Sequence, residues 1–128
     1  MISFATLLLA TNAIAASCPA TITDKQNIVA PSHQEVHVDQ HPRHLEMMRV
    51  YSDRPETRLQ LVPDHQTHKN KTVWDFGPRG TSVWIECTYK RSAVSLRQYV
   101  PNARRCTFVH NSNSGGDKRK GHCKRVAP

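Results

Sequence analysis

The sequence predicts a mainly β fold, a small antiparallel sheet or sandwich held by disulfides. Three observations predict this class. Short runs rich in β-branched and aromatic residues alternate with turn signals. A chain of 128 residues has room for a single domain. Four cysteines are present, and small domains outside the cytosol often depend on disulfides for stability.

The first sixteen residues have the features of a secretory signal peptide. They form an uncharged, largely apolar run that is too short to span a membrane. Small residues follow at Ala13-Ile14-Ala15 and Ala15-Ala16-Ser17, the pattern that signal peptidase reads, although no Lys or Arg follows Met1. We therefore expect residues 1–16 to be removed by cleavage near Ala15–Ser17. The mature protein is expected to be periplasmic or secreted, with no transmembrane segment.

The mature chain divides into three parts. Residues 17–44 are polar and interrupted by prolines, which predicts an irregular leader. Residues 45–110 are expected to form the β domain, with strands at 45–51, 57–62, 72–76, 81–89 and 104–110 and a hairpin between the first two. Residues 93–100 fit a strand and a short helix equally well. Residues 111–128 lack apolar periodicity and predict a flexible basic tail.

The run from Thr81 to Tyr89 is the clearest strand. Its period of two separates an inner from an outer face. The inner face is expected to carry Val83, Ile85, Cys87 and Tyr89, and the outer face Trp84, Glu86 and Thr88.

The four cysteines can pair in three ways. We expect Cys87 to pair with Cys106, which joins two strands, and Cys18 to pair with Cys123, which ties the leader to the tail. An alternative remains open for Cys18, because a cysteine that follows a signal peptide is a lipidation site in lipoproteins. Acylation there would leave one of the other three cysteines unpaired.

Positive charge is concentrated at the C-terminal end. The formal net charge is +8, and residues 101–128 supply +6 of it, with seven Lys or Arg against one acidic residue. The basic residues of this tail suggest an anion-binding site for lipopolysaccharide or phospholipid headgroups: Lys118, Arg119, Lys120, Lys124 and Arg125. Export argues against nucleic acid, and no aromatic residue lies among these charges to stack on bases.

The leader contains a cluster of four histidines, His33, His37, His41 and His44. Imidazole groups bind Zn²⁺, Cu²⁺ and Ni²⁺, so the cluster is a candidate metal site. Pro42 interrupts the helix that would place the four on one face. A polar, exposed leader is the favoured interpretation, and we expect no cofactor.

The middle of the chain resembles a largely uncharacterised family of small periplasmic proteins of Gram-negative bacteria. The resemblance rests on the order and spacing of short motifs: Cys18-Pro19, Val50–Glu56, Leu61–Asp64, Trp74-Asp75, Trp84–Tyr89 in the pattern Trp-[Leu/Ile]-x-Cys-x-Tyr, and a late group with Leu96, Pro101, Arg104, Arg105, Cys106 and Val109. Arg54 departs from the family pattern, which has glycine there. The resemblance implies a β-rich, disulfide-bonded periplasmic domain and supplies no active site.

The function that these observations favour is that of a non-catalytic binding protein with a protein partner in the envelope. No G-x-S-x-G or other nucleophile motif is present, so catalysis is not expected. The sharpest hypothesis is an inhibitor of a cell-wall lytic enzyme such as lysozyme. The turn Lys90-Arg91-Ser92 is then the candidate contact, because its cations would face the catalytic carboxylates of a glycosidase. Anion binding through the tail is the alternative.

Overall fold

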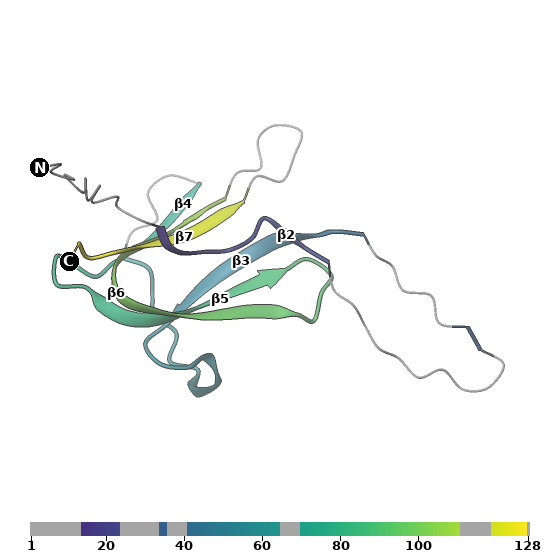
Figure 1. Cartoon of the computed structure of the whole chain (residues 1–128), viewed down its shortest axis with the longest axis horizontal. Coiled ribbons are helices and arrows are strands. Elements are labelled where there is room, and N and C mark those ends of the chain that lie inside the picture. Colours follow the sequence, from purple (N-terminus) through teal and green to yellow (C-terminus); the bar gives the residue numbers. More distant parts are fainter. Residues whose placement is uncertain (1–13, 24–33, 36–40, 65–69, 111–118, 128) are drawn as a thin grey trace, which may run out of the picture.

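The computed structural model describes residues 14–23, 34–35, 41–64, 70–110 and 119–127. The described chain is built from strands and one short 3-10 helix, as Figure 1 shows. The elements are β1 (Ile14–Ser17), β2 (Thr21–Ile22), β3 (Arg43–Tyr51), η1 (Pro55–Thr57), β4 (Lys71–Asp75), β5 (Thr81–Tyr89), β6 (Ser95–Val109) and β7 (Lys120–Arg125). Every strand pairing is antiparallel, which confirms the predicted fold class. Within the part of the chain described, no helix has the length and apolar character needed to cross a membrane.

Strand β6 connects the two layers of the fold. The strand order is β1-β7-β6-β5-β3-β2, and β4 pairs with β6 beside this path. The first part of β6 pairs with β5, whereas its second part lies between β7 and β4. Between the two parts, Asn102 adopts a φ of 51° and the register shifts next to Ala103. The sheet therefore curls over on itself, and the two halves of β6 lie in different layers (Figure 1).

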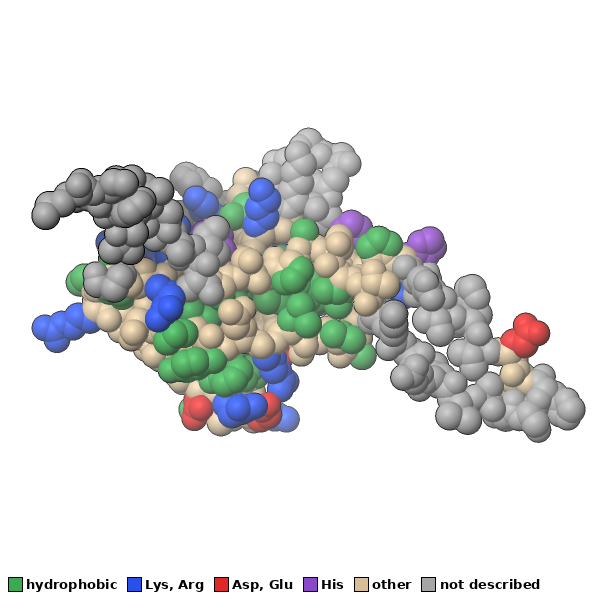
Figure 2. Space-filling model, viewed as in Figure 1, with side chains coloured by type: hydrophobic (Ala, Val, Ile, Leu, Met, Phe, Trp, Pro, Cys, Tyr) green, Lys and Arg blue, Asp and Glu red, His purple; other side chains and the backbone are tan. Residues whose placement is uncertain are grey.

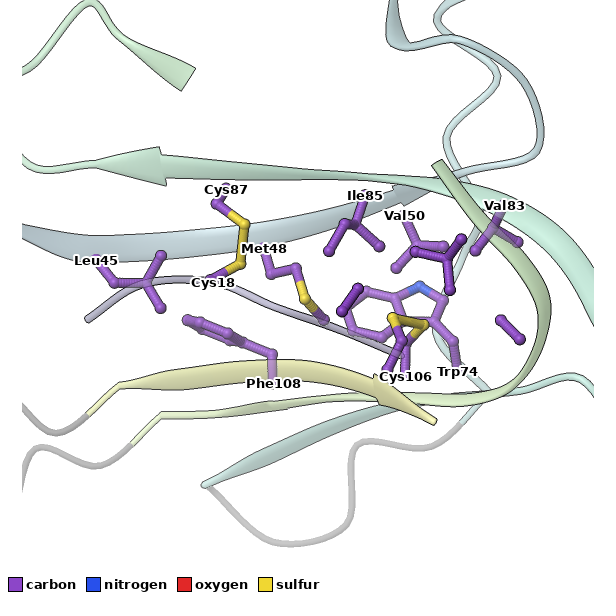
Figure 3. Packing of buried hydrophobic residues seen from close by; sticks show 14 of the residues in the cluster. Cys18, Leu45, Met48, Val50, Trp74, Val83, Ile85, Cys87, Cys106 and Phe108 are labelled. Atoms are coloured by element: carbon purple, nitrogen blue, oxygen red, sulfur yellow. A yellow bond between two sulfur atoms is a disulfide. The ribbon is translucent and has the colours of Figure 1, made fainter. Parts of the chain in front are cut away.

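The hydrophobic core fills the space between these layers. Figure 3 shows Val50, Val83 and Ile85 from one layer facing Trp74 and the other strands of the second layer. All three of these side chains are fully buried, and for Val83 and Ile85 this confirms the inner face that the period-two pattern of residues 81–89 predicted. Burying such aliphatic side chains contributes about 2 kcal/mol each, so the core supplies most of the driving force for folding.

Both disulfides lie in this core, and the expected pairing is wrong. Cys18 pairs with Cys87, and Cys106 pairs with Cys123. Cys106 and Cys123 lie directly opposite each other in β6 and β7, where cross-strand side chains are close enough to bond. Cys18, which follows β1, reaches across to β5 (Figure 3). The Cys18–Cys87 bond also uses the Cys18 sulfur that lipidation would need.

The expected flexible tail contains a strand of the sheet, which corrects the prediction for this segment. Lys120–Arg125 forms β7 between β1 and β6. Its inward residues are Gly121 and Cys123, and a Cβ at Gly121 would approach the Cys18 sulfur to 3.2 Å. Because glycine and cysteine are the inward positions, the strand has no run of large apolar residues to mark it. Residues 111–118 lie outside the described part.

The expected hairpin forms only in part. Its first strand is β3, but the segment expected as the second strand begins with η1. Arg58 then takes a left-handed φ of 59°, and only Gln60 forms an isolated bridge, opposite Tyr51. By contrast, the ambiguous segment 93–100 enters β6 as a strand at Ser95. The domain bounds at 16, 44 and 110 remain predictions, although β1, β2 and β7 extend the sheet beyond residues 45–110.

The disulfide connectivity makes a prediction about stability. Removing the Cys18–Cys87 bond, which spans 69 residues, is expected to lower the free energy of unfolding by about 4 kcal/mol. Removing the Cys106–Cys123 bond, which spans 17 residues, is expected to cost about 3 kcal/mol. Double Cys→Ala variants measured by urea unfolding provide the comparison. Non-reducing peptide mapping that links Cys87 to Cys106 would contradict the arrangement described.

Candidate functional site

The outer face of the layer formed by β3, β5 and β6 carries two rows of large side chains. In the first row Tyr51, Trp84 and Tyr99 lie side by side on the three strands. In the second row Glu86 lies between its neighbours on β3 and β6, and the β6 neighbour is Arg97. We call this surface the aromatic–arginine face and define it by Tyr51, Arg54, Trp84, Glu86, Arg97 and Tyr99.

The aromatic side chains form a stacked group at the surface. The Trp84 and Tyr99 ring centroids are 5.6 Å apart and the rings are tilted by 53°. Arg54, held just before η1, places its guanidinium carbon 4.8 Å from the centre of the Trp84 ring. Tyr99 is about half exposed (49%), so the group faces solvent. Figure 2 shows hydrophobic side chains beside acidic and basic ones where Figure 1 places the η1 loop.

Glu86 organises the polar part of this face. Its side chain is almost fully buried, yet its carboxylate accepts a hydrogen bond from Arg97 Nε at 2.8 Å and one from the Tyr51 hydroxyl at 3.2 Å. Arg97 also donates through Nη1 to Glu56 at 2.7 Å, which ties η1 to β6. Arg54 lies 3.4 Å from the other Glu56 oxygen. A buried carboxylate with these partners is compensated, and the network fixes the side chains around it.

The electrostatics of the face follow from these contacts. Burial raises the pKa of Tyr51, and the charge and hydrogen bond of Glu86 raise it further. The hydrogen bond to Glu86 likewise raises the pKa of Arg97. A hydrogen bond with its own backbone lowers the pKa of Glu56, and the charges of Arg54 and Arg97 act in the same direction. At neutral pH the face therefore presents a charged Arg97 and a neutral Tyr51 hydroxyl, with a charged Glu56 beside them.

The predicted contact at Lys90, Arg91 and Ser92 is a turn at the other end of the β5–β6 hairpin. The Lys90 amide donates to the His44 carbonyl at 2.9 Å, and Arg91 has a left-handed φ of 57°. Lys90 is six residues beyond Trp84, roughly 20 Å along an extended strand. The structure therefore does not bring this turn together with the aromatic–arginine face.

The basic residues expected in the tail point in different directions. Lys120 and Lys124 lie on the outward side of β7, and both are exposed. Arg119 donates to the Glu46 carbonyl of β3 at 3.2 Å, and Arg125 donates to a β6 carbonyl, that of Pro101, at 3.1 Å. The remaining residue of the set, Lys118, lies outside the described part.

Half of the histidine cluster can be placed. His41 and His44 are described, whereas His33 and His37 lie outside the described residues. The described segments contain no group of three or more His, Cys, Asp or Glu that is arranged to hold a metal ion. A metal site built on all four histidines stays an untested prediction.

The aromatic–arginine face was only partly visible in the sequence. The period-two pattern placed Trp84 and Glu86 on the outer side of their strand. Nothing in the sequence set the register that puts Tyr99 and Arg97 beside them, because that register depends on the turn between β5 and β6. In the sequence, Arg54 was notable only because the family pattern has glycine at this position. The structure adds it to the aromatic–arginine face because its guanidinium lies over the Trp84 ring.

Comparison with known families decides what kind of protein carries this face. A family model described as type VI secretion system Tli immunity protein matches residues 39–124, which is more than half of the chain. The chain belongs to the type VI secretion system Tli immunity protein family. The match runs from just before β3 into β7 and therefore includes the whole aromatic–arginine face. Neither a curated protein nor a solved structure matches the chain significantly.

The Glu86 network predicts a selective effect on one tyrosine. In Glu86→Gln, the pKa of Tyr51 is expected to fall toward its ordinary value of 10.0, because the negative charge beside the hydroxyl is lost. It should stay above that value, since burial is the larger cause of the shift. The measurement is a pH titration of the tyrosine ring carbons by NMR. Tyr89 is the internal control: its pKa is raised by burial alone and should not move.

Proposed function

We propose that this protein is a non-catalytic immunity protein that binds an effector of a type VI secretion system and blocks it in the cell envelope. Membership of the Tli immunity protein family is the observation that carries the proposal. An immunity protein needs tight, specific recognition of a toxin and no chemistry of its own. A rigid protein-binding surface is therefore the feature to look for.

The aromatic–arginine face supports this function by composition. Trp, Tyr and Arg are the residue types that most often carry the binding energy of protein interfaces. Here Trp84 contacts both Tyr99 and Arg54 on a surface that solvent reaches. Their large side chains offer a contact area that a partner can bury around a compact centre.

Preorganisation of the face supports it as well. The Glu86 carboxylate fixes Tyr51 and Arg97, and Arg97 in turn holds Glu56. Because these side chains are already ordered, less conformational entropy is lost when a partner binds. The surrounding strands are joined by continuous antiparallel pairing, which keeps the backbone beneath the face in one geometry.

The envelope location rests on the disulfides. Two disulfides and no free cysteine are typical of a protein that folds in an oxidising compartment. The apolar start of the chain, which predicts a signal peptide, agrees with export. Together they favour the periplasm as the place where the effector is met.

The identity of the effector is a separate proposal. If the effector is a cell-wall lytic enzyme such as lysozyme, its active site contains a pair of catalytic carboxylates. The turn Lys90-Arg91-Ser92 is then the candidate contact for these carboxylates. Since this turn lies far along the hairpin from Trp84, variants at the two places separate the two contacts. Loss of inhibition in Lys90→Ala/Arg91→Ala alone would favour the turn.

A bacterial competition assay tests the proposed function. Sensitive recipient cells that export the wild-type protein should survive attack by a bacterium that uses the matching type VI effector. In Trp84→Ser/Tyr99→Ser we expect binding to weaken by about 30-fold or more, as for loss of an interface hot spot of about 2 kcal/mol. Recipients with this variant should lose most of their protection.

Two further variants keep the test decisive. Arg54→Glu changes an exposed loop side chain and should reduce protection without affecting folding. Val62→Ser changes an exposed apolar side chain that is not part of the aromatic–arginine face, and it should protect like the wild type. If recipients with the wild-type protein die as fast as those without it, the immunity function is wrong. If all variants protect equally, the aromatic–arginine face is the wrong surface.

A further inference from the structure

The outer side of the second layer has a different character from the aromatic–arginine face. The register of β7, β6 and β4 alternates inward and outward residues across these strands. The outward set is Lys120, His122 and Lys124 on β7, Arg105, Thr107 and Val109 on β6, and Lys71, Val73 and Asp75 on β4. We call this surface the cationic face. In Figure 2, Lys and Arg side chains project over the upper part of the molecule, where Figure 1 places β4 and β7.

Among the residues that the structure describes, no acidic side chain forms an ion pair with the lysines of this face. Asp75 is the acidic residue of the described set, and it is already paired with Arg105 at 2.9 Å. Lys71 and Lys120 both flank Val109 from neighbouring strands. Their charges therefore lie on the same side of the sheet, together with that of Lys124.

The pKa of His122 responds to the positive charges around it on this face. Its pKa is lowered first by burial and then by the charges of Lys124 and Lys71. Both lysines are thus near enough to act on the same imidazole, although they come from strands on opposite sides of β6. The positive charges form one patch across three strands.

The chemistry of the patch fits an anionic lipid surface. Each Lys or Arg side chain close to an anionic bilayer adds to the electrostatic attraction at moderate ionic strength. A sheet face brings several of them to a common plane, whereas a cleft would be needed to enclose a single small anion. Among its described outward residues the face has no Phe, Tyr or Trp side chain to stack on nucleic-acid bases.

We propose that the cationic face docks the folded protein on the surface of a bilayer that contains anionic phospholipids. The face lies on the side of the sandwich opposite the aromatic–arginine face, because the inner sides of the two layers enclose the core. Docking therefore leaves Trp84 and Tyr99 accessible to a protein partner. This inference does not depend on the identity of the effector.

Vesicle co-sedimentation of the exported, oxidised protein tests the proposal. We expect binding to phosphatidylglycerol-containing vesicles, none to phosphatidylcholine vesicles, and a steep loss of binding as salt is added. Lys71→Glu/Lys124→Glu should bind at least about tenfold more weakly, because two attractive charges become repulsive. Arg58→Glu/Arg91→Glu is the matched control, since both arginines are exposed and the net charge changes equally. The control should retain most of the binding.

Four outcomes would overturn the proposal. The first is no binding to anionic vesicles, and the second is an equal loss in both charge-reversal variants, which would reflect net charge alone. The third is binding to lipopolysaccharide without binding to phospholipid vesicles, and the fourth is equal binding to neutral vesicles. The disulfides of each variant, checked by intact mass, show that the fold is retained. Protection in the competition assay is scored separately, so failure of docking and failure of the immunity function are distinguishable.

Discussion

The bend in strand β6 is the feature on which the rest of the structure depends. One continuous strand pairs with β5 from Ser95 to Ala103, with β7 from Ala103 to Val109, and with β4 from Arg105 to Val109. Because successive side chains of a strand alternate between faces, the bend turns the inner side of both halves toward one core. The same bend turns the two outer sides away from each other. Without it, the aromatic–arginine face and the cationic face would lie on one flat sheet and the core would be open.

The disulfides stabilise this arrangement at two levels. Cys106–Cys123 fixes β7 to the second half of β6, and Cys18–Cys87 connects β1 to β5 in the other layer. Both bonds are buried, whereas the side chains of the two outer faces are at least partly open to solvent at Trp84, Tyr99, Lys71 and Lys124. In the proposed function, the inner sides of the strands therefore stabilise the fold, and their outer sides bind partners. This separation allows the outer side chains to change for a new partner without changing the core.

Composition and period-two patterns were enough to predict the fold class and the inner face of β5. They failed where the local sequence carries little apolar signal. In β7 the inward positions are Gly121 and Cys123, and the strand forms because a neighbouring strand presents Cys106 opposite Cys123. The disulfide pairing failed for the same reason, since it depends on which strands are adjacent. The candidate site could be predicted only in part. The period-two pattern placed Trp84 on the outer side of its strand, whereas only the strand register shows that Tyr99 lies beside it.

The proposed roles of the two faces divide protein recognition and membrane docking between two sides of one small domain. A membrane-docked immunity protein would present its recognition surface toward proteins arriving in the envelope, at the place where an incoming effector is met. The charged side chains of the aromatic–arginine face are paired, Arg97 with Glu86 inside the face and Arg54 with the neighbouring Glu56. Within the described part of the chain, the lysines of the cationic face have no acidic partner. This contrast matches a specific protein contact on one side and a diffuse electrostatic contact on the other.

The central claim is that the effector is bound by the aromatic–arginine face. Amide hydrogen exchange of the protein, free and in complex with the effector against which it protects, tests this most directly. The account predicts slower exchange in β5 and in the first half of β6, around Trp84 and Tyr99, with β7 unchanged. Slower exchange confined to β7 and β4, with β5 unchanged, would contradict it.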